Sequence, residues 1–507
     1  MAVLDSKIVL TIFAALILVL FAFLSPLYPV FQESVTYLLG VKYFSLTDGV
    51  PAAPGHYFYT VALRGASEIA GDGFAGMLLL GRVFALIALW SVYRAARFLH
   101  SRTAGFLAAF VFIIHPFILV SAISGDPAFA SVAVFSLGAY LGIRTIRDPD
   151  PIGLFRFSVL LGLAGGFSFD AFLALAPLWL VLAYRAGSKK EPLIASVIVV
   201  FAGITLWLLP ALSAAGGFSE LLRLFVNGSV WIEQRTSRTL LLLEYGKAFS
   251  FGCLLFSFVL FFLLKKAGHA YRGRLMRHSI LLTLPALIIS LFQVALGRNP
   301  SALIIVPVPL VIFCASVGAL LFEPESTIYG RRRYMVLGLM MALPGLVFLL
   351  AGGESGPKND SLFRAEQWTL GTLKSRVEYS TQFKEHAERF ASAGWDSMLV
   401  VVAASGSLSS REIAHLLFPV EVYDMHPVPE NERQIMTYFH KHRRFLLTDS
   451  DVELKKRTCL FIGNEGIFDD KLPQSQRLKL PDGRVMNIIK SGSARKLLFR
   501  SQNWIME

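Results

Sequence analysis

The stretch "GMLLLGRVFALIALW", residues 76–90, decides the class of fold. Arg82 is its single charged residue, and the apolar run continues on both sides to cover 74–93. About 20 apolar residues are enough to cross the hydrocarbon core of a bilayer as a helix. The whole chain has the same character, since its 507 residues are 55% hydrophobic and 16% charged, with a mean hydropathy of +0.59. This composition excludes an ordinary soluble enzyme and predicts an integral membrane protein.

Apolar runs of bilayer length, or close to it, recur along the first 351 residues. We count eleven, and they cover 8–31, 74–93, 104–123, 127–143, 154–169, 171–184, 193–211, 248–264, 279–296, 301–322 and 334–351. The first run is too long for the apolar core of a signal peptide, and no small-residue cleavage site follows it before "YPVFQE". We therefore expect an α-helical polytopic membrane protein with about eleven transmembrane helices.

The positions of Lys and Arg predict how the chain crosses the membrane, because short cytoplasmic loops retain basic residues. With a cytoplasmic N-terminus, the inner segments hold 18 of the 26 basic residues before residue 352, although the outer loops 32–73 and 212–247 are the long ones. An odd number of spans then places residues 352–507 outside. We expect a multi-pass protein of the inner (plasma) membrane whose C-terminal domain is extracytoplasmic, or periplasmic. The membrane part carries +11 of the net charge of +13, so no nucleic-acid partner is expected.

The chain changes character at "AGGESGPKND", residues 351–360, which is typical of a linker between domains. The elements predicted after it are a helix within 361–392, a strand at 396–404, a helix at 409–418 and strands at 443–449 and 458–464. This alternation predicts a small soluble α/β domain over 352–507, following a transmembrane domain over 1–351. No Gly-rich phosphate loop or metal-spaced histidine cluster occurs in this part of the sequence, so we expect the catalytic centre elsewhere.

Carboxylates are few on the predicted outer side of the membrane part, and two stand out. Glu33 and Asp126 follow the first and third apolar runs at nearly the same depth, and Asp170 follows the fifth. A charged side chain costs about 2.5 to 3.5 kcal/mol at the centre of the bilayer, so such groups usually face a cavity or a partner. The structural alternatives are that Asp126, just before Pro127, caps a helix, and that Glu33 is simply solvated at a helix end.

Arg82 lies about two turns inside the second apolar run, where a charge requires an acidic partner. Glu33 and Asp126 are the candidates. A buried pair of this kind could hold an outer cavity in shape or take part in chemistry.

Several features occur in an order that resembles the C-type (GT-C) membrane glycosyltransferases, the superfamily of the protein O-mannosyltransferases and the lipid A aminoarabinose transferases. They are Gln32-Glu33, "PAAPGHYFY" (51–59), "GRVFAL" (81–86), "HPFILVSAISGDPAFASVAVFSLGAYLGIR" (115–144) and "LGRNPSALIIVPVPLVIF" (296–313). The resemblance covers roughly residues 8–351. Gln32 stands where relatives carry the Asp regarded as the base, and Asp170 lies near a position where aminoarabinose transferases tend to have Lys.

The resemblance implies transfer of a sugar from an undecaprenyl-phosphate or similar polyprenyl-phosphate donor to a lipid, glycan or protein acceptor. It implies Glu33 and Asp126 as catalytic residues, since a carboxylate must receive the proton of the acceptor. A fixed cation must bind the departing lipid phosphate, and Arg298 is the first candidate. The full predicted substrate-binding set is Arg298, Arg82, His56, Tyr57, Tyr59, Asp48, Lys42 and Arg64, with Lys247 as a further cation.

Alternative readings of these residues stay open. Arg298 could be a snorkelling loop arginine, and Tyr57 and Tyr59 could be interfacial anchors. No cofactor is certain, although two or three outer carboxylates could hold a divalent metal. The loop 212–247 could be a lid over the lipid or a passive interfacial helix.

Two other classes of protein compete with an active transferase. With Gln32 in place of the Asp, the chain could be an inactive relative that binds polyprenyl lipid or scaffolds glycan assembly. If the enzyme is active, either Glu33 or Asp126 acts as the base, or the acceptor is acidic enough to need little help. A secondary transporter is disfavoured, because the acids lie at one face and no repeat is evident.

Overall fold

The computed structural model describes the helical part of the chain most fully. It describes much of residues 11–51, then 56–148, 150–186, 190–227, 269–295, 304–322 and 370–390, and separate short segments, mainly strands, between 398 and 506. Every statement below refers to these residues.

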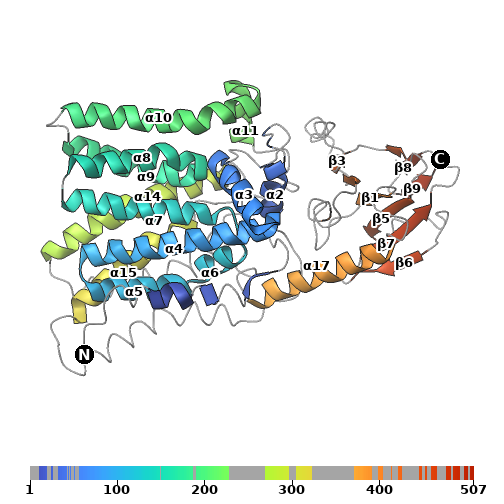
Figure 1. Ribbon diagram of the computed structural model, residues 1–507, viewed down its shortest axis with the longest axis horizontal. Coiled ribbons are helices and arrows are strands. Elements are labelled where there is room, and N and C mark those ends of the chain that lie inside the picture. Colours follow the sequence, from blue (N-terminus) through green and yellow to red (C-terminus); the bar gives the residue numbers. More distant parts are fainter. Residues whose placement is uncertain are drawn as a thin grey trace.

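A bundle of helices forms the larger part of the structure. Its helices are α2 (Gln32–Lys42), α3 (Tyr57–Ala70), α4 (Gly73–Leu99), α5 (Arg102–Ile114), α6 (Pro116–Ile123), α7 (Phe129–Arg147), α8 (Pro151–Phe167), α9 (Phe169–Ala186), α10 (Lys190–Ala215), α11 (Phe218–Asn227), α14 (His269–Ala295) and α15 (Pro307–Phe322). The long helices lie side by side, and the short helices α2, α3, α6 and α11 gather at the end of the bundle nearest α17 (Leu370–Phe390) (Figure 1).

The predicted apolar runs agree well with these helices. Eight of the eleven runs fall on described helices, from α4 through α15, whereas 248–264 and 334–351 lie outside the described residues and 8–31 is described only in part. By length and composition, three helices in the described part can cross a membrane, namely α4, α7 and α10, and several shorter apolar helices accompany them. The count of eleven spans therefore stays a prediction.

One predicted span, 104–123, is two helices in the structure. His115 has an extended backbone (φ −67°, ψ 123°), and Pro116 is the first residue of α6. The residue before a proline is driven away from helical backbone angles, which ends α5 at this point. The short α6 then leads into a turn at Gly125 (φ +67°) before α7 begins. This break positions the loop that carries Asp126.

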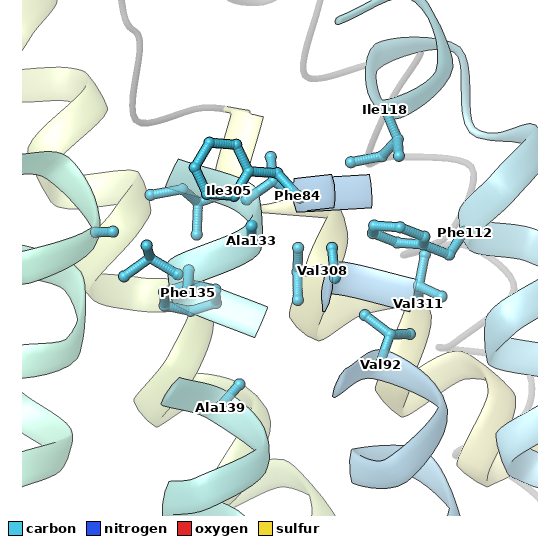
Figure 2. Packing of buried hydrophobic residues seen from close by; sticks show 14 of the residues in the cluster. Phe84, Val92, Phe112, Ile118, Ala133, Phe135, Ala139, Ile305, Val308 and Val311 are labelled. Carbon is cyan, nitrogen blue, oxygen red and sulfur yellow. The ribbon is translucent and has the colours of Figure 1, made fainter. Parts of the chain in front are cut away.

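The helices contact one another through large apolar side chains in some places and through glycine in others. Phe84 of α4, Phe112 of α5 and Phe135 of α7 meet residues around α15 in one buried cluster (Figure 2). Between α8 and α10 the backbones themselves approach, because a Cβ added to Gly203 would lie 2.7 Å from the Gly162 backbone. In lipid, close packing of this kind drives helix association, since apolar surface gains little by leaving an apolar solvent.

The C-terminal part contains two β-sheets. The six-stranded sheet has the order β3-β2-β1-β5-β7-β6, with β1 (Met398–Val402) parallel to β2 and β5 and with β7 antiparallel to β5 and β6. The other sheet is antiparallel, in the order β4-β8-β9. The remaining strands are β2 (Glu421–Asp424), β3 (Phe445–Leu447), β4 (Asp451–Glu453), β5 (Thr458–Asn464), β6 (Gln476–Lys479), β7 (Arg484–Lys490), β8 (Lys496–Arg500) and β9 (Asn503–Met506).

Three of these strands, β1, β3 and β5, lie within the stretches predicted as strands, and α17 lies within the predicted helical segment 361–392. The predicted helix at 409–418 falls almost wholly outside the described residues. The other six strands were not predicted from the sequence. The division of the chain at residue 352 stays a prediction.

Candidate functional site

The candidate site lies at the end of the bundle where the short helices gather (Figure 1). Three contacts assemble it. The Tyr37 ring of α2 meets the Tyr59 ring of α3 edge-on at 5.2 Å, and Tyr59 in turn stacks on Phe84 of α4 at 6.1 Å. Phe58 of α3 packs against Phe167 at the end of α8, with ring centroids 5.7 Å apart. Residues from four helices thus converge around Tyr59.

Asp126 is brought to this end by the loop between α6 and α7. The loop is pressed against α4, because a Cβ on Gly81 would lie 3.0 Å from the Ala122 carbonyl oxygen and 3.4 Å from the Gly125 Cα. Only 4% of Asp126 is exposed. The backbone N–H of Ala128 donates to its Oδ1 (2.9 Å), and the Ser121 hydroxyl donates to its Oδ2 (3.5 Å). The carboxylate closes the turn before α7, but it does not cap the helix, because the N-cap residue of α7 is Ala128 and no side chain bonds to the first turn there.

The charge of Asp126 also acts on a side chain of the neighbouring helix α3. Tyr59 is buried, and burial together with the nearby Asp126 carboxylate raises the pKa of the Tyr59 hydroxyl well above its usual range. The phenol therefore keeps its proton at any physiological pH. A buried carboxylate and a permanently protonated hydroxyl lie within electrostatic range of each other.

His56 forms the other side of the cluster. A hydrogen bond of 2.8 Å joins the Tyr37 hydroxyl to its Nδ1. His56 has φ 27° and ψ 67°, and it is the single non-glycine residue with positive φ in the described part of the chain. Such a backbone costs of the order of 1 to 3 kcal/mol and persists when the surroundings fix it, often at functional sites. Burial lowers the pKa of His56 to about 4, so the imidazole is neutral at pH 7.

The structure thus brings together three residues predicted as site residues: His56, Tyr59 and Asp126. A neutral imidazole can both donate and accept a hydrogen bond, and an ionised carboxylate accepts. This combination suits the recognition of hydroxyl groups and the removal of a proton from one of them. Tyr57 lies beside the cluster, where its ring meets Phe44 at 5.6 Å.

Arg82 lies on α4 between Gly81 and Phe84, close to the loop of Asp126. Its Nε is buried and has no hydrogen-bond partner among the described residues. No ion pair between Arg82 and Asp126 is seen there, and the side chain of Glu33 lies outside the described residues. The predicted pairing of Arg82 with an acid therefore stays a prediction.

The remaining predicted residues are not part of the cluster as described. Arg64 is exposed and pairs with Glu68 of the next turn of α3 (3.7 Å), which is a surface pair of little energetic weight. Gln32, Glu33 and Lys42 lie in α2, but nothing is described of the Glu33 and Lys42 side chains. Asp48, Lys247 and Arg298 lie outside the described residues.

Sequence reasoning missed two polar contacts near this end. One is Tyr37, whose hydroxyl meets His56 from 19 positions away. The other is Gln293 of α14, whose amide donates to Oδ1 of Asp170 at 2.9 Å. The second contact could have been suspected from the sequence, because Gln293 is a polar residue inside the apolar run 279–296. The hydrogen bond from the Gln293 amide stabilises the carboxylate of Asp170 inside the bundle.

Within the described residues, no three His, Cys, Asp or Glu side chains come together as a metal site. The Glu33 side chain and Asp48 lie outside the described residues. Metal dependence stays open.

Comparisons with known proteins bear on the fold and on this end of the bundle. Residues 56–213 match a family model described as dolichyl-phosphate-mannose-protein mannosyltransferase. This segment contains His56, Tyr59, Arg82, Asp126 and Asp170. A search of the curated proteins finds no match.

Two solved structures share the architecture. The crystal structure of ArnT from Cupriavidus metallidurans bound to undecaprenyl phosphate is 11% identical, with a TM-score of 0.60, and the match covers 94% of this chain and 97% of that one. The Archaeoglobus fulgidus oligosaccharyltransferase in its apo form is 13% identical, with a TM-score of 0.50, and the match covers 79% of this chain and 63% of that one. Both are C-type glycosyltransferases, so the resemblance read from the sequence is confirmed at the level of fold.

Proposed function

Because the chain has the fold of the C-type membrane glycosyltransferases, we propose that it transfers a sugar from a polyprenyl-phosphate donor to an extracytoplasmic acceptor of the cell envelope. The acceptor class is a lipid, a glycan or a protein. The observation that carries the proposal is the buried Asp126 carboxylate beside Tyr59, inside the segment that matches a mannosyltransferase family model. The ArnT structure of the same fold is bound to undecaprenyl phosphate, which supports the donor class.

In this proposal the carboxylates handle the proton. Asp126 or Glu33 accepts the proton of the incoming hydroxyl as that oxygen attacks the sugar, and positioned bases of this kind accelerate a reaction by about 10²- to 10⁴-fold. Asp126 is already oriented by the Ala128 N–H. Position 33 lies one helical turn before Tyr37 in α2, which brings it to the same end of the bundle.

The cations and the aromatic cluster bind the two substrates. Arg298 contacts the departing lipid phosphate, with Lys42, Arg64 and Lys247 as further cations, because negative charge develops on the leaving group. Arg82 and Asp48 complete the substrate-binding set. Neutral His56, whose Nδ1 is bonded to the Tyr37 hydroxyl, offers the sugar or acceptor one hydrogen bond through Nε2, as donor or acceptor according to its tautomer, at the entrance that Tyr57 and Tyr59 line.

The same proposal includes the arrangement in the membrane. Eleven helices cross the plasma membrane, the N-terminus is cytoplasmic, and residues 352–507 form a soluble α/β domain on the periplasmic side. The apolar helices α4, α7 and α10 support the membrane part, and the two sheets support the α/β part. Labelling of single cysteines introduced before residue 8 and after residue 352 with a membrane-impermeant reagent tests this arrangement. Only the second position should react in intact cells.

The function is tested with purified full-length protein and polyprenyl-phosphate sugars. Mass spectrometry of lipid that co-purifies with the protein narrows the choice of donor, and release of the free polyprenyl phosphate measures transfer. The proposal expects transfer by the wild type and its loss in Asp126→Ala or Glu33→Ala.

Gln32 favours one alternative function, that of an inactive relative that binds the lipid. Lipid that co-purifies with a protein which transfers no sugar from a broad panel of donors would support this alternative and overturn the proposal. Absence of both lipid and transfer would overturn both.

A further inference from the structure

The opposite end of α4 and α7 carries a polar cluster that the proposed transfer does not use. Helix α4 begins beside the Asp126 loop and α7 begins just after it, so both helices run away from the candidate site. Near their far ends, Trp90 and Arg94 lie one turn apart on α4, and Tyr140 and Arg144 lie one turn apart on α7. Residues four apart share a helix face. We call these four residues the α4–α7 cluster.

An aromatic base holds one guanidinium in this cluster. The Trp90 and Tyr140 rings meet edge-on at 5.2 Å. Cζ of Arg94 lies 5.8 Å from the Trp90 ring centroid and 5.7 Å from that of Tyr140, within the range of a cation–π interaction. Tyr140 is almost fully buried, whereas Trp90 is 39% exposed. The guanidinium is therefore held by one buried ring and one partly exposed ring.

Most of the hydrogen-bonding capacity of Arg94 is unused in the described structure. A guanidinium has five N–H donors, and the single contact seen is a long one of 3.5 Å from Nη2 to the Tyr140 hydroxyl. Arg94 forms no ion pair with a described residue, and the pairs Arg64–Glu68 and Arg223–Glu220 lie elsewhere in the bundle. A positive charge fixed in place without a carboxylate is an anion-binding arrangement.

The surroundings strengthen the positive field. Arg144 is exposed one turn beyond Tyr140, and Arg147 lies over the Phe98 ring and donates to the Phe98 carbonyl. The nearby acids in the sequence are Asp148, at the C-cap of α7, and Asp150, whose Oδ1 accepts the Ile152 N–H at the start of α8. Neither forms an ion pair with these arginines in the described structure.

An apolar stripe on α4 leads to the guanidinium. Val83 is 43% exposed and lies seven positions before Trp90, so the two residues share a face two turns apart. From Val83 to Arg94 the helix rises about 16 Å. Inorganic phosphate would make no contact with this stripe. The acyl chain of a phospholipid would pack against it while the phosphate headgroup meets Arg94.

We propose that the α4–α7 cluster binds the phosphate headgroup of an anionic phospholipid, whose acyl chain lies along the stripe from Val83 to Trp90. Arg94 and Arg144 supply the positive charge, and Trp90 with Tyr140 fixes the direction of Arg94. This inference depends on the membrane fold and not on sugar transfer.

The test titrates phosphatidylglycerol into full-length protein in neutral detergent and follows bound lipid by native mass spectrometry. Each arginine near an anionic headgroup contributes about 1 kcal/mol, so Arg94→Gln should weaken binding about fivefold and Arg94→Gln with Arg144→Gln about 25-fold. Arg185→Gln is the matched control, because it removes an exposed arginine from the last turn of α9, at the same end of the bundle as Arg94 and Arg144. It should weaken binding less than twofold.

Two further measurements separate the sources of the effect. Trp90→Leu keeps every charge and removes half of the aromatic base, so weaker binding in this variant supports a built site even if the arginine variants fail to fold. Phosphatidylcholine should bind weakly, and inorganic phosphate at the same concentration as the lipid should not displace phosphatidylglycerol. Equal losses in Arg94→Gln and Arg185→Gln, or displacement by inorganic phosphate, would overturn the proposal.

Discussion

Both ends of α4 hold polar groups among aromatic rings, but the charged groups differ. A buried carboxylate lies at the candidate site, whereas the far end has arginines and, among the described residues, no carboxylate in contact with Arg94. At the candidate site the Asp126 carboxylate accepts from the backbone and a neutral His56 bonds to the Tyr37 hydroxyl, with Arg82 close by on α4. At the far end a guanidinium rests on two rings and meets no carboxylate in the described structure. Under the two proposals made above, one helix pair, α4 and α7, presents a proton-handling surface at one end and an anion-binding surface at the other.

The largest effect on stability is expected in the loop between α6 and α7, which positions Asp126 at the candidate site. Gly125 has φ +67°, and a Cβ there would lie 3.1 Å from Cγ of Met77. Gly125→Ala should cost about 2 kcal/mol of folding free energy and shift Asp126 away from Tyr59. Thermal unfolding in detergent measures the loss.

Gly65→Ala is the control for this change, because a Cβ on Gly65 meets nothing within 4 Å. It should be neutral or stabilise the helix by about 0.5 to 1 kcal/mol. Equal melting temperatures for the two variants would contradict the packing described for the loop.

The next effect concerns the contact between Tyr37 and His56. Tyr37→Phe removes the hydroxyl and leaves Nδ1 without its partner, so kcat/KM for sugar transfer should fall about tenfold, or about 1.4 kcal/mol. Tyr184→Phe, which removes the hydroxyl of a tyrosine that is 89% exposed on α9, should leave it almost unchanged. If the two variants behave alike, the hydrogen bond has no positioning role.

A pH effect follows from the lowered pKa of His56. The imidazole has a pKa of about 4 in the folded protein and an ordinary value of 6.5, so the unfolded chain binds the proton more readily. Stability from this group is therefore complete above pH 6.5 and is lost as the pH falls towards 4. The melting temperature of His56→Gln should fall less between pH 7 and pH 5 than that of the wild type. Parallel curves would show that His56 is not held neutral by the fold.

The smallest effect is expected for the exposed pair on α3. Arg64→Gln breaks the contact with Glu68, and such surface pairs contribute about 0 to 1 kcal/mol. Its melting temperature should stay close to that of the wild type. A large loss would show that Arg64 belongs to the cluster around Tyr59 after all.

Hydrophobicity predicted most of the bundle because a span depends on a local run of apolar residues. Eight runs coincide with described helices. The break before Pro116 has a local cause as well, and a stricter use of the proline rule would have found it. Asp126 could be nominated from the scarcity of outer carboxylates, and His56 from its flanking tyrosines and the resemblance to a family.

The partners of these residues could not be predicted, because packing between helices decides them. Tyr37 meets His56 across 19 residues and Gln293 meets Asp170 across 123. In the same way, no pattern within α4 shows that Tyr140 of α7 lies under Arg94. Short strands such as β2 and β4 also escaped prediction, since runs of three or four residues carry little periodicity.

The most direct test of the central claim is the rate of sugar transfer by Asp126→Asn, measured beside Glu68→Gln in correctly folded, membrane-reconstituted protein. The substitution keeps the shape of the Asp126 side chain and removes its charge, whereas Glu68→Gln removes an exposed carboxylate from the same end. We predict a loss of about 10²- to 10⁴-fold for Asp126→Asn and almost none for Glu68→Gln. Equal rates for the two variants would exclude Asp126 as the base and contradict this account of the site.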